Sequence, residues 1–184
     1  MICLSRICWV INMLYIFVEG PDDERYISRI ISPLLCSTQI VRYAGMPNSK
    51  VNSFLQTISQ TPSWDYIFLG DADGKTIEER RNCLTAKYTK LSPEKTFIVE
   101  YEIESWYYAG ATEENCKKLK LKHFVFLTDT LTKEQLYSKM LRPVDKKYIL
   151  ECLLDVYSLP YAITRNSSLG ILSENIKERT RSAV

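Results

Sequence analysis

Two short apolar runs, each ending in carboxylates and a glycine, constrain the fold of this chain more than any other feature. The first reads Tyr-Ile-Phe-Val-Glu-Gly-Pro-Asp-Asp over 15–23, and the second reads Tyr-Ile-Phe-Leu-Gly-Asp-Ala-Asp-Gly over 66–74. Runs of β-branched and aromatic residues are typical of buried strands. In an open parallel sheet, ligands bind at the edge where the strands end. The sequence therefore predicts two strands that bring acidic side chains to one edge of a sheet.

The first 110 residues alternate strand and helix patterns, which predicts an α/β fold with a mostly parallel sheet and right-handed crossovers. We expect about four strands, sandwiched by helices, at 13–18, 38–43, 64–69 and 96–101. The helices between them are expected to begin at Pro21, Asn48 and Thr76. Beyond residue 110 the pattern becomes helical, near 113–122, 133–141 and 145–157, and from Ser167 or Ser168 onward. We therefore expect a core over 13–110 and a helical extension over 111–184 packed on the same domain.

Composition narrows the class of protein. With 184 residues and 46% hydrophobic residues, the chain can bury one full core. A net charge of +2 gives no overall positive field, so any contact with nucleic acid must come from local patches. The six cysteines lie far apart, without the spacing of a zinc finger, and are expected to be buried free thiols in a reducing cytoplasm. The single histidine, His123, excludes zinc sites built from several histidines, and we expect it to be structural.

The apolar segment 1–12 needs separate treatment. It lacks the small-residue cleavage site of a signal peptide and runs directly into the first expected strand. Arg6, Asn12 and its short length disfavour a membrane span. We therefore expect no membrane partner, a cytoplasmic protein, and a translation start at Met13.

The acidic residues after the strands predict an oxygen-ligated metal site. Hard cations such as Mg²⁺ or Mn²⁺ prefer carboxylate ligands. Cleavage of a phosphodiester by two metal ions needs about four carboxylates to hold them. The candidate ligands are Glu19, Asp71, Asp73, Glu102 and Glu104. We expect Asp71 and Asp73 to point to one side of an extended chain, Glu102 and Glu104 likewise, and Glu19 to lie within roughly a dozen ångströms of Asp71 and Asp73.

A strand ending in Val-Glu-Gly-x-x-Asp over 18–23, followed by one ending in Asp-Ala-Asp over 71–73, resembles the TOPRIM fold. Topoisomerases, bacterial primases, recombination-repair proteins and OLD-type nucleases share this fold, and the resemblance covers residues 13–110. The stretch Glu-Ile-Glu-Ser-Trp over 102–106 is similar to small stand-alone TOPRIM-like proteins and OLD-type nucleases. The resemblance implies that Asp71 and Asp73 hold the metal and that Glu19 joins them or acts as general acid/base. Asp23 would orient the turn.

The function expected from these residues is that of a metal-dependent nuclease acting on DNA or RNA, with DNA favoured, and with a role in phage defence or nucleic-acid processing. The chain has no P-loop, so an ATPase partner would be encoded separately. Two rival interpretations stay open. One is a non-catalytic TOPRIM-like subunit that binds nucleic acid or belongs to a defence complex. The other is a haloacid-dehalogenase-like phosphatase, which also uses Asp-x-Asp but places it after the first strand.

Each motif also has a plain structural interpretation. Glu19 and Asp23 suit the cap of the helix at Pro21, and Glu102 and Glu104 suit the first turn of a helix. The aromatic cluster 106–108 is expected in the core. The basic residues considered for nucleic-acid binding are Lys75, Lys117, Lys118, Lys120 and Arg165. Arg80 and Arg81, just beyond the Asp-Ala-Asp loop, suit a phosphate or an exposed helix face equally well.

Overall fold

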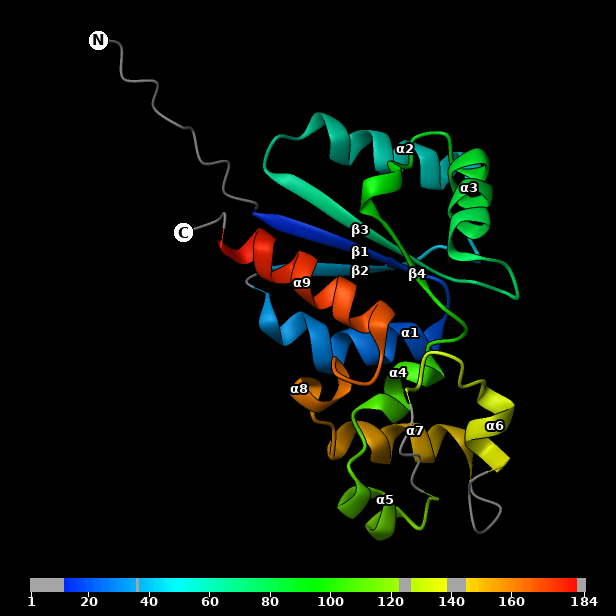
Figure 1. Ribbon diagram of the computed structural model, residues 1–184. Helices are drawn as coiled ribbons and strands as arrows, with labels where there is room; N and C mark the ends of the chain where they lie inside the picture. Colours follow the sequence, from blue (N-terminus) through cyan, green and yellow to red (C-terminus); the bar gives the residue numbers. More distant parts are fainter. Residues whose placement is uncertain (1–11, 36, 123–126, 139–144, 182–184) are drawn as a thin grey trace.

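The computed structural model describes residues 12–35, 37–122, 127–138 and 145–181. Four parallel strands form one sheet in the order β2-β1-β3-β4 (Figure 1). These strands are β1 (Met13–Val18), β2 (Thr38–Arg42), β3 (Trp64–Asp71) and β4 (Thr96–Val99). The predicted α/β fold with a four-stranded parallel sheet flanked by helices is therefore confirmed. Segments 1–11 and 123–126, which include His123, lie outside the described residues.

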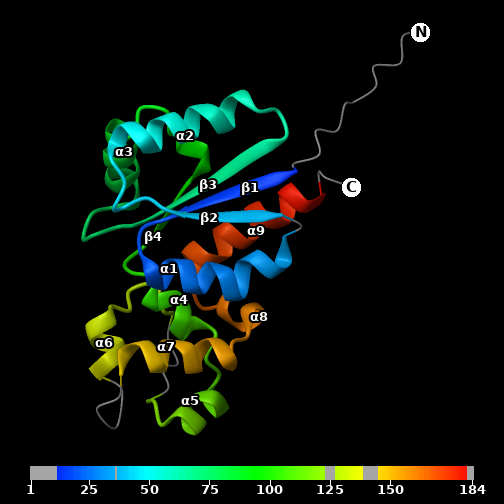
Figure 2. The same ribbon diagram turned by 180° about the vertical axis from the view of Figure 1, so that it is seen from behind.

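Helices cover both faces of this sheet and form the extension. Around the sheet lie α1 (Pro21–Tyr26), the π-helix η1 (Ile27–Ile31), the 3₁₀ turns η2 (Ser32–Leu34) and η3 (Pro93–Lys95), α2 (Asn48–Gln60), α3 (Ile77–Lys87) and α9 (Ser167–Arg181). The extension contains α5 (Glu113–Leu119), α6 (Lys133–Ser138), α7 (Lys146–Asp155) and α8 (Leu159–Ala162), and α4 (Glu104–Ala109), which precedes it in the chain, packs with α6 and α7. Seen from both sides, α2 and α3 lie on one face, and α1 and α9 on the other (Figures 1 and 2).

The central strand β1 shows why the sheet is covered on both faces. Successive side chains of a strand point to opposite faces. Leu14, Ile16 and Val18 join a core cluster with residues of α1, α4, α7 and α9. Tyr15 and Phe17 join a second cluster with residues of α2 and α3. A strand buried on both faces is apolar at every position, which is the continuous run seen in the sequence.

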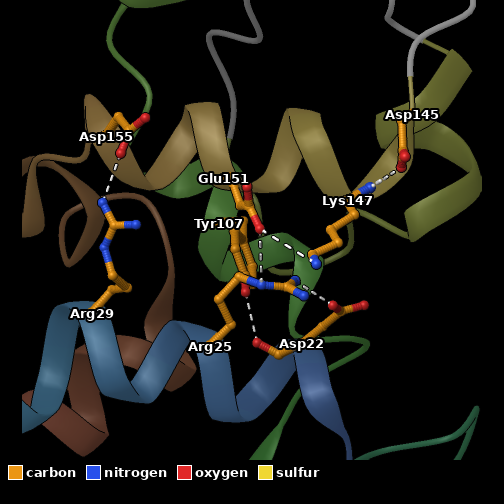
Figure 3. A network of polar contacts seen from close by, with 8 residues as sticks. All are labelled: Asp22, Arg25, Arg29, Tyr107, Asp145, Lys147, Glu151 and Asp155. Carbon is orange, nitrogen blue, oxygen red and sulfur yellow. Dashed lines mark hydrogen bonds and ion pairs between the residues drawn. The ribbon is translucent and has the colours of Figure 1, made fainter.

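The first core cluster runs from the sheet into the extension. Trp106, Tyr107 and Tyr108 of α4 are buried in it, as predicted for the aromatic cluster. The Trp106 indole donates a hydrogen bond to Ser168 Oγ at 2.8 Å, which ties α4 to α9. Figure 3 shows a second link between α1 and the extension. There, Arg25 contacts Glu151 of α7 at 3.8 Å, and the Tyr107 hydroxyl donates to the backbone oxygen of Asp22.

Two further sequence predictions can be compared with this structure. Cys83, Cys116 and Cys152 are free thiols, as expected, but of these only Cys116 is buried: Cys83 is exposed and Cys152 is partly buried, so the predicted burial is wrong for Cys83. Cys3, Cys8 and Cys36 lie outside the described residues. None of the helices formed by the described residues has the length and apolar composition needed to cross a bilayer.

Candidate functional site

The acidic side chains meet at the carboxyl end of the sheet, where β1 and β3 are neighbours. Glu19 follows β1 directly, Asp71 is the last residue of β3, and Asp73 lies two residues further on. One nitrogen, Arg80 Nη2, lies 3.3 Å from Glu19 Oε2 and 2.8 Å from Asp73 Oδ2. These two carboxylate oxygens therefore cannot be further apart than the sum of the two distances. The parallel pairing of β1 with β3 is what brings them together.

The loop after β3 turns sharply instead of staying extended. Asp73 has a φ of +52° and Gly74 a φ of +74°, and Lys75 N donates to Ala72 O at 3.0 Å. Positive φ is tolerated by Gly and, among other residues, mostly by Asn and Asp. The prediction that Asp71 and Asp73 point to one side of an extended chain is therefore wrong in its reasoning. The turn, rather than strand alternation, aims the Asp73 carboxylate at Arg80.

Asp71 is the most perturbed acid of the group. Its Oδ1 is buried and has no hydrogen-bond partner among the described residues. Burial raises the pKa of Asp71 to about 9, and the negative charges of Asp23, Glu19, Glu104 and Asp73 add to this rise. We refer to these five acids (Glu19, Asp23, Asp71, Asp73 and Glu104) as the acidic edge. Without a further cation, Asp71 keeps its proton at neutral pH.

The other two acids of the acidic edge are Asp23, in the first turn of α1, and Glu104, at the start of α4. Asp23 Oδ2 accepts a hydrogen bond from Gly20 N at 3.0 Å, so this carboxylate holds the turn between β1 and α1. Burial raises the pKa of Asp23 to about 6. Glu104 is the first residue of α4 and only 7% exposed, and burial, together with the Glu102 charge, raises its pKa to about 7.

The structure corrects the prediction for Glu102. Its two carboxylate oxygens accept hydrogen bonds from Lys133 N and Lys133 Nζ, both at 2.7 Å, at the start of α6. The pairing of β4 with β3 ends where Val99 meets Asp71, so residues 100–103 are not part of the strand. Glu102 and Glu104 therefore do not share a strand face. The alternative interpretation, a first helical turn, holds for Glu104.

Most of the basic residues considered for nucleic acid do not adjoin the acidic edge. Lys117 and Lys118 form exposed ion pairs within α5, and Lys120 ends that helix with a φ of +56°. In both views α5 lies far from the loop after β3 (Figures 1 and 2). The position of Arg165 does not agree with a role in nucleic-acid binding. Its guanidinium is buried and donates to the backbone oxygens of Ala109 and Ala111. It stabilises the turn between α4 and α5.

Lys75 is the exception, because it lies at the acidic edge. It lines an open cavity of about 520 Å³ beside Asp73, together with Gly74, Thr76, Ile77, Glu78, Glu100 and Tyr101. The Tyr101 side chain is 39% exposed there.

Three residues at the site could not be assigned to it from sequence. Tyr43 donates from its hydroxyl to Glu19 Oε2 at 3.3 Å, Arg80 pairs with Glu19 and Asp73, and Lys133 holds Glu102. Tyr43 follows directly after β2, so its position at a strand end is the only available signal. The sequence placed Arg80 near the loop but could not choose between phosphate and solvent. Nothing in the sequence pattern connects Lys133 with this edge.

The donor chemistry of the acidic edge fits a hard divalent cation. The side chains are all carboxylates, and the unpartnered Asp71 Oδ1 lies in a field of other negative charges. Across the ranges that the structure describes, however, no three acidic, histidine or cysteine side chains stand close enough to share one ion. Arg80 is the cation that lies between Glu19 and Asp73. A metal would therefore need these side chains to rearrange.

Comparison of the chain with protein-family models, with curated proteins and with solved structures gave no match.

Proposed function

We propose that this chain is a divalent-metal-dependent nuclease that hydrolyses phosphodiester bonds, with Mg²⁺ or Mn²⁺ held at the acidic edge. One observation carries the proposal. Carboxylates from two adjacent parallel strands, Glu19 and Asp73, share one guanidinium beside Asp71, whose Oδ1 is buried without a partner among the described residues. Burial of the Asp23, Asp71 and Glu104 carboxyls beside other acids costs free energy of folding, because burial disfavours the charged form of each. The TOPRIM resemblance of residues 13–110 agrees with the proposal.

The residues of the acidic edge have distinct parts in such a reaction. Glu19, Asp71 and Asp73 would hold the metal, with Glu104 as a further candidate ligand, while Asp23 keeps the turn at Gly20 in place. When bound, a divalent ion neutralises charge on the phosphoryl oxygens and lowers the pKa of bound water. The cavity at Lys75 and Tyr101 would receive a nucleotide next to Asp73. Its lysine can contact a phosphate and its tyrosine can stack on a base.

The direct test is cleavage of plasmid, linear duplex and single-stranded DNA, and of RNA, by the purified protein with Mn²⁺ or Mg²⁺. We expect cleavage by the wild type, loss in Asp71→Ala, and none when the metal is chelated. Asp155→Asn is the matched control, because it alters an exposed acid that pairs with Arg29, far from the acidic edge. Absence of cleavage of every substrate by folded protein with metal present would refute an autonomous nuclease.

The non-catalytic alternative is also supported by a specific observation. Arg80 already pairs with both Glu19 and Asp73, so these two carboxylates have a cationic partner without a metal. A binding subunit would retain nucleic-acid binding in a mobility-shift assay after Asp71→Ala and show no metal-dependent cleavage before it. A role in phage defence beside a separate ATPase rests on the TOPRIM resemblance alone. Restriction of phage growth by wild type but not by Asp71→Ala would support that role.

A further inference from the structure

Arg80 holds a position at the acidic edge that a general structural role does not explain. It lies in α3, just after the Asp-Ala-Asp loop, and its side chain is only 14% exposed. Its Nη2 contacts one carboxylate that follows β1 and one that follows β3, at 3.3 and 2.8 Å. A single positive charge therefore pairs with two acids that follow different strands and offsets only one of their two negative charges.

The Arg80 side chain packs over a glycine of the sheet. Gly70 of β3 lies beneath it, and a Cβ atom at Gly70 would lie 2.8 Å from Leu84 Cδ1, 3.3 Å from Tyr43 Oη and 4.0 Å from Arg80 Nε. The absence of a side chain at Gly70 therefore leaves room for Leu84 and for the Tyr43 hydroxyl that donates to Glu19. A larger residue would clash with Leu84 and shift the Tyr43 hydroxyl by a few tenths of an ångström, whereas Arg80 Nε would be in ordinary van der Waals contact with it.

The Arg80 guanidinium makes both of these ion pairs through one nitrogen, Nη2, and its buried Nε has no hydrogen-bond partner among the described residues. A guanidinium is a planar fork whose paired N–H groups match two oxygens of one carboxylate or phosphate. Neither carboxylate engages the fork in this way, so its preferred two-oxygen partner is not a side chain seen here.

We propose that Arg80 is a built-in counter-cation that exchanges partners during substrate binding. Without a divalent ion, Arg80 pairs with both Glu19 and Asp73. With the ion at the acidic edge, Arg80 turns its fork to the oxygens of the substrate phosphodiester. The inference rests on the proposed function and deepens it, because it assigns Arg80 as the residue that recognises the phosphate. Since Arg80 competes with the metal only while it has no phosphate, metal and nucleic acid must strengthen each other's binding.

The test compares Arg80→Gln with Arg80→Lys and with the neighbouring Arg81→Gln. Arg81→Gln removes the same charge as Arg80→Gln, but the side-chain hydrogen bond that it removes is a weak one of 3.4 Å to Thr96 O. Mn²⁺ binding is measured by calorimetry and by the Mn²⁺-dependent rise in melting temperature, without nucleic acid. We expect Arg80→Gln to bind Mn²⁺ about tenfold more tightly than wild type, a change of about 1.4 kcal/mol. Arg81→Gln should match wild type.

Cleavage and nucleic-acid binding in saturating Mn²⁺ form the second part of the test. Arg80→Gln should bind nucleic acid about tenfold more weakly. Arg80→Lys keeps the charge without the fork, so it should compete with Mn²⁺ as wild type does and still bind nucleic acid less well. Tighter Mn²⁺ binding by Arg80→Gln over wild type supports the exchange, even if wild type binds no measurable metal.

Two results would overturn the exchange, and they differ in what they say of the proposed function. If wild type binds Mn²⁺ and cleaves, but Arg80→Gln and Arg80→Lys do the same equally well, Arg80 is a static ion pair and only this inference fails. If no variant binds Mn²⁺ and none cleaves, the metal-dependent function fails as well. Circular dichroism of each variant checks that these results come from folded protein.

Discussion

Replacing Asp71 by Asn should stabilise the metal-free protein while removing a side chain on which the proposed nuclease depends. The reason is the burial of this carboxyl beside other acids, with its Oδ1 lacking a partner in the described part of the chain. An amide has nearly the same shape but carries no charge at any pH. The substitution therefore removes the cost of keeping an ionisable group at the acidic edge.

The size of the effect follows from the pKa. Burial raises the pKa of Asp71 from 3.8 to about 9, so folding at neutral pH requires the carboxyl to take up a proton that the unfolded chain has lost. This costs about 1.4 kcal/mol for each pH unit above 3.8, or at most about 4 kcal/mol at pH 7 and about 2 kcal/mol at pH 5. Solvent relaxation lowers this ceiling, and Asn keeps a buried oxygen without a donor. We expect a gain between about 1 and 3 kcal/mol at pH 7.

Urea unfolding at pH 7, pH 5 and pH 4, without metal and with chelator, measures this gain. The advantage of Asp71→Asn should shrink as the pH falls and be small at pH 4, because this pH is close to the unfolded pKa of 3.8 and little free energy is then needed to protonate the carboxyl. Asp155→Asn, an exposed acid, should change the free energy of unfolding by less than about 0.5 kcal/mol. With Mn²⁺ added, wild type should gain stability and Asp71→Asn should not. A destabilised Asp71→Asn, or a gain independent of pH, would refute the reasoning.

Three further predictions concern other parts of the fold. In Gly110→Ala, the new Cβ would lie 2.4 Å from ring carbons of Tyr157, so the free energy of unfolding should fall by about 3 kcal/mol; a fall below about 1 kcal/mol in urea would show that the ring can shift. Asp129 accepts hydrogen bonds from the Ser167 N and Oγ at the start of α9, so Asp129→Ala should cost about 1–2 kcal/mol by thermal unfolding, and Asp129→Asn less. Lys117→Ala should leave the urea unfolding midpoint and the cleavage rate unchanged, because its ion pair in α5 is exposed and remote from the acidic edge.

The sheet could be predicted from sequence because its signals are local. The bounds of β1 match the expected 13–18, since a strand buried on both faces is apolar throughout. The end of β3 was missed by two residues. Gly70 and Asp71 join the sheet through backbone pairing with β4, which needs no apolar side chain. Helix α8 was missed for a similar reason, because four residues are too few to show a helical period.

The acidic edge was only partly predictable. Glu19, Asp71 and Asp73 stand at strand ends, so the order of the strands suffices to bring them together. The side chains that pair with these acids, Arg80 and Tyr43, could not be identified from sequence, because tertiary packing brings them to the strand ends. Arg80 is one of several charged residues on α3, and nothing local distinguishes it from Arg81. Arg165 shows the opposite error, since a basic residue between polar neighbours looks exposed in sequence but is enclosed by the α4–α5 turn.

The position of Glu104 links the acidic edge to the helical extension. Every residue of α4 is buried, and Ser105 and Trp106 are held by Asn166 and Ser168 at the start of α9. The next residue of α4, Tyr107, donates from its hydroxyl to the backbone oxygen of Asp22, next to Asp23. The backbone at Glu104 cannot shift without disturbing these hydrogen bonds, whereas its carboxylate can still rotate. The extension therefore fixes where Glu104 stands relative to Asp71, so the residues beyond 110 are part of the acidic edge's support.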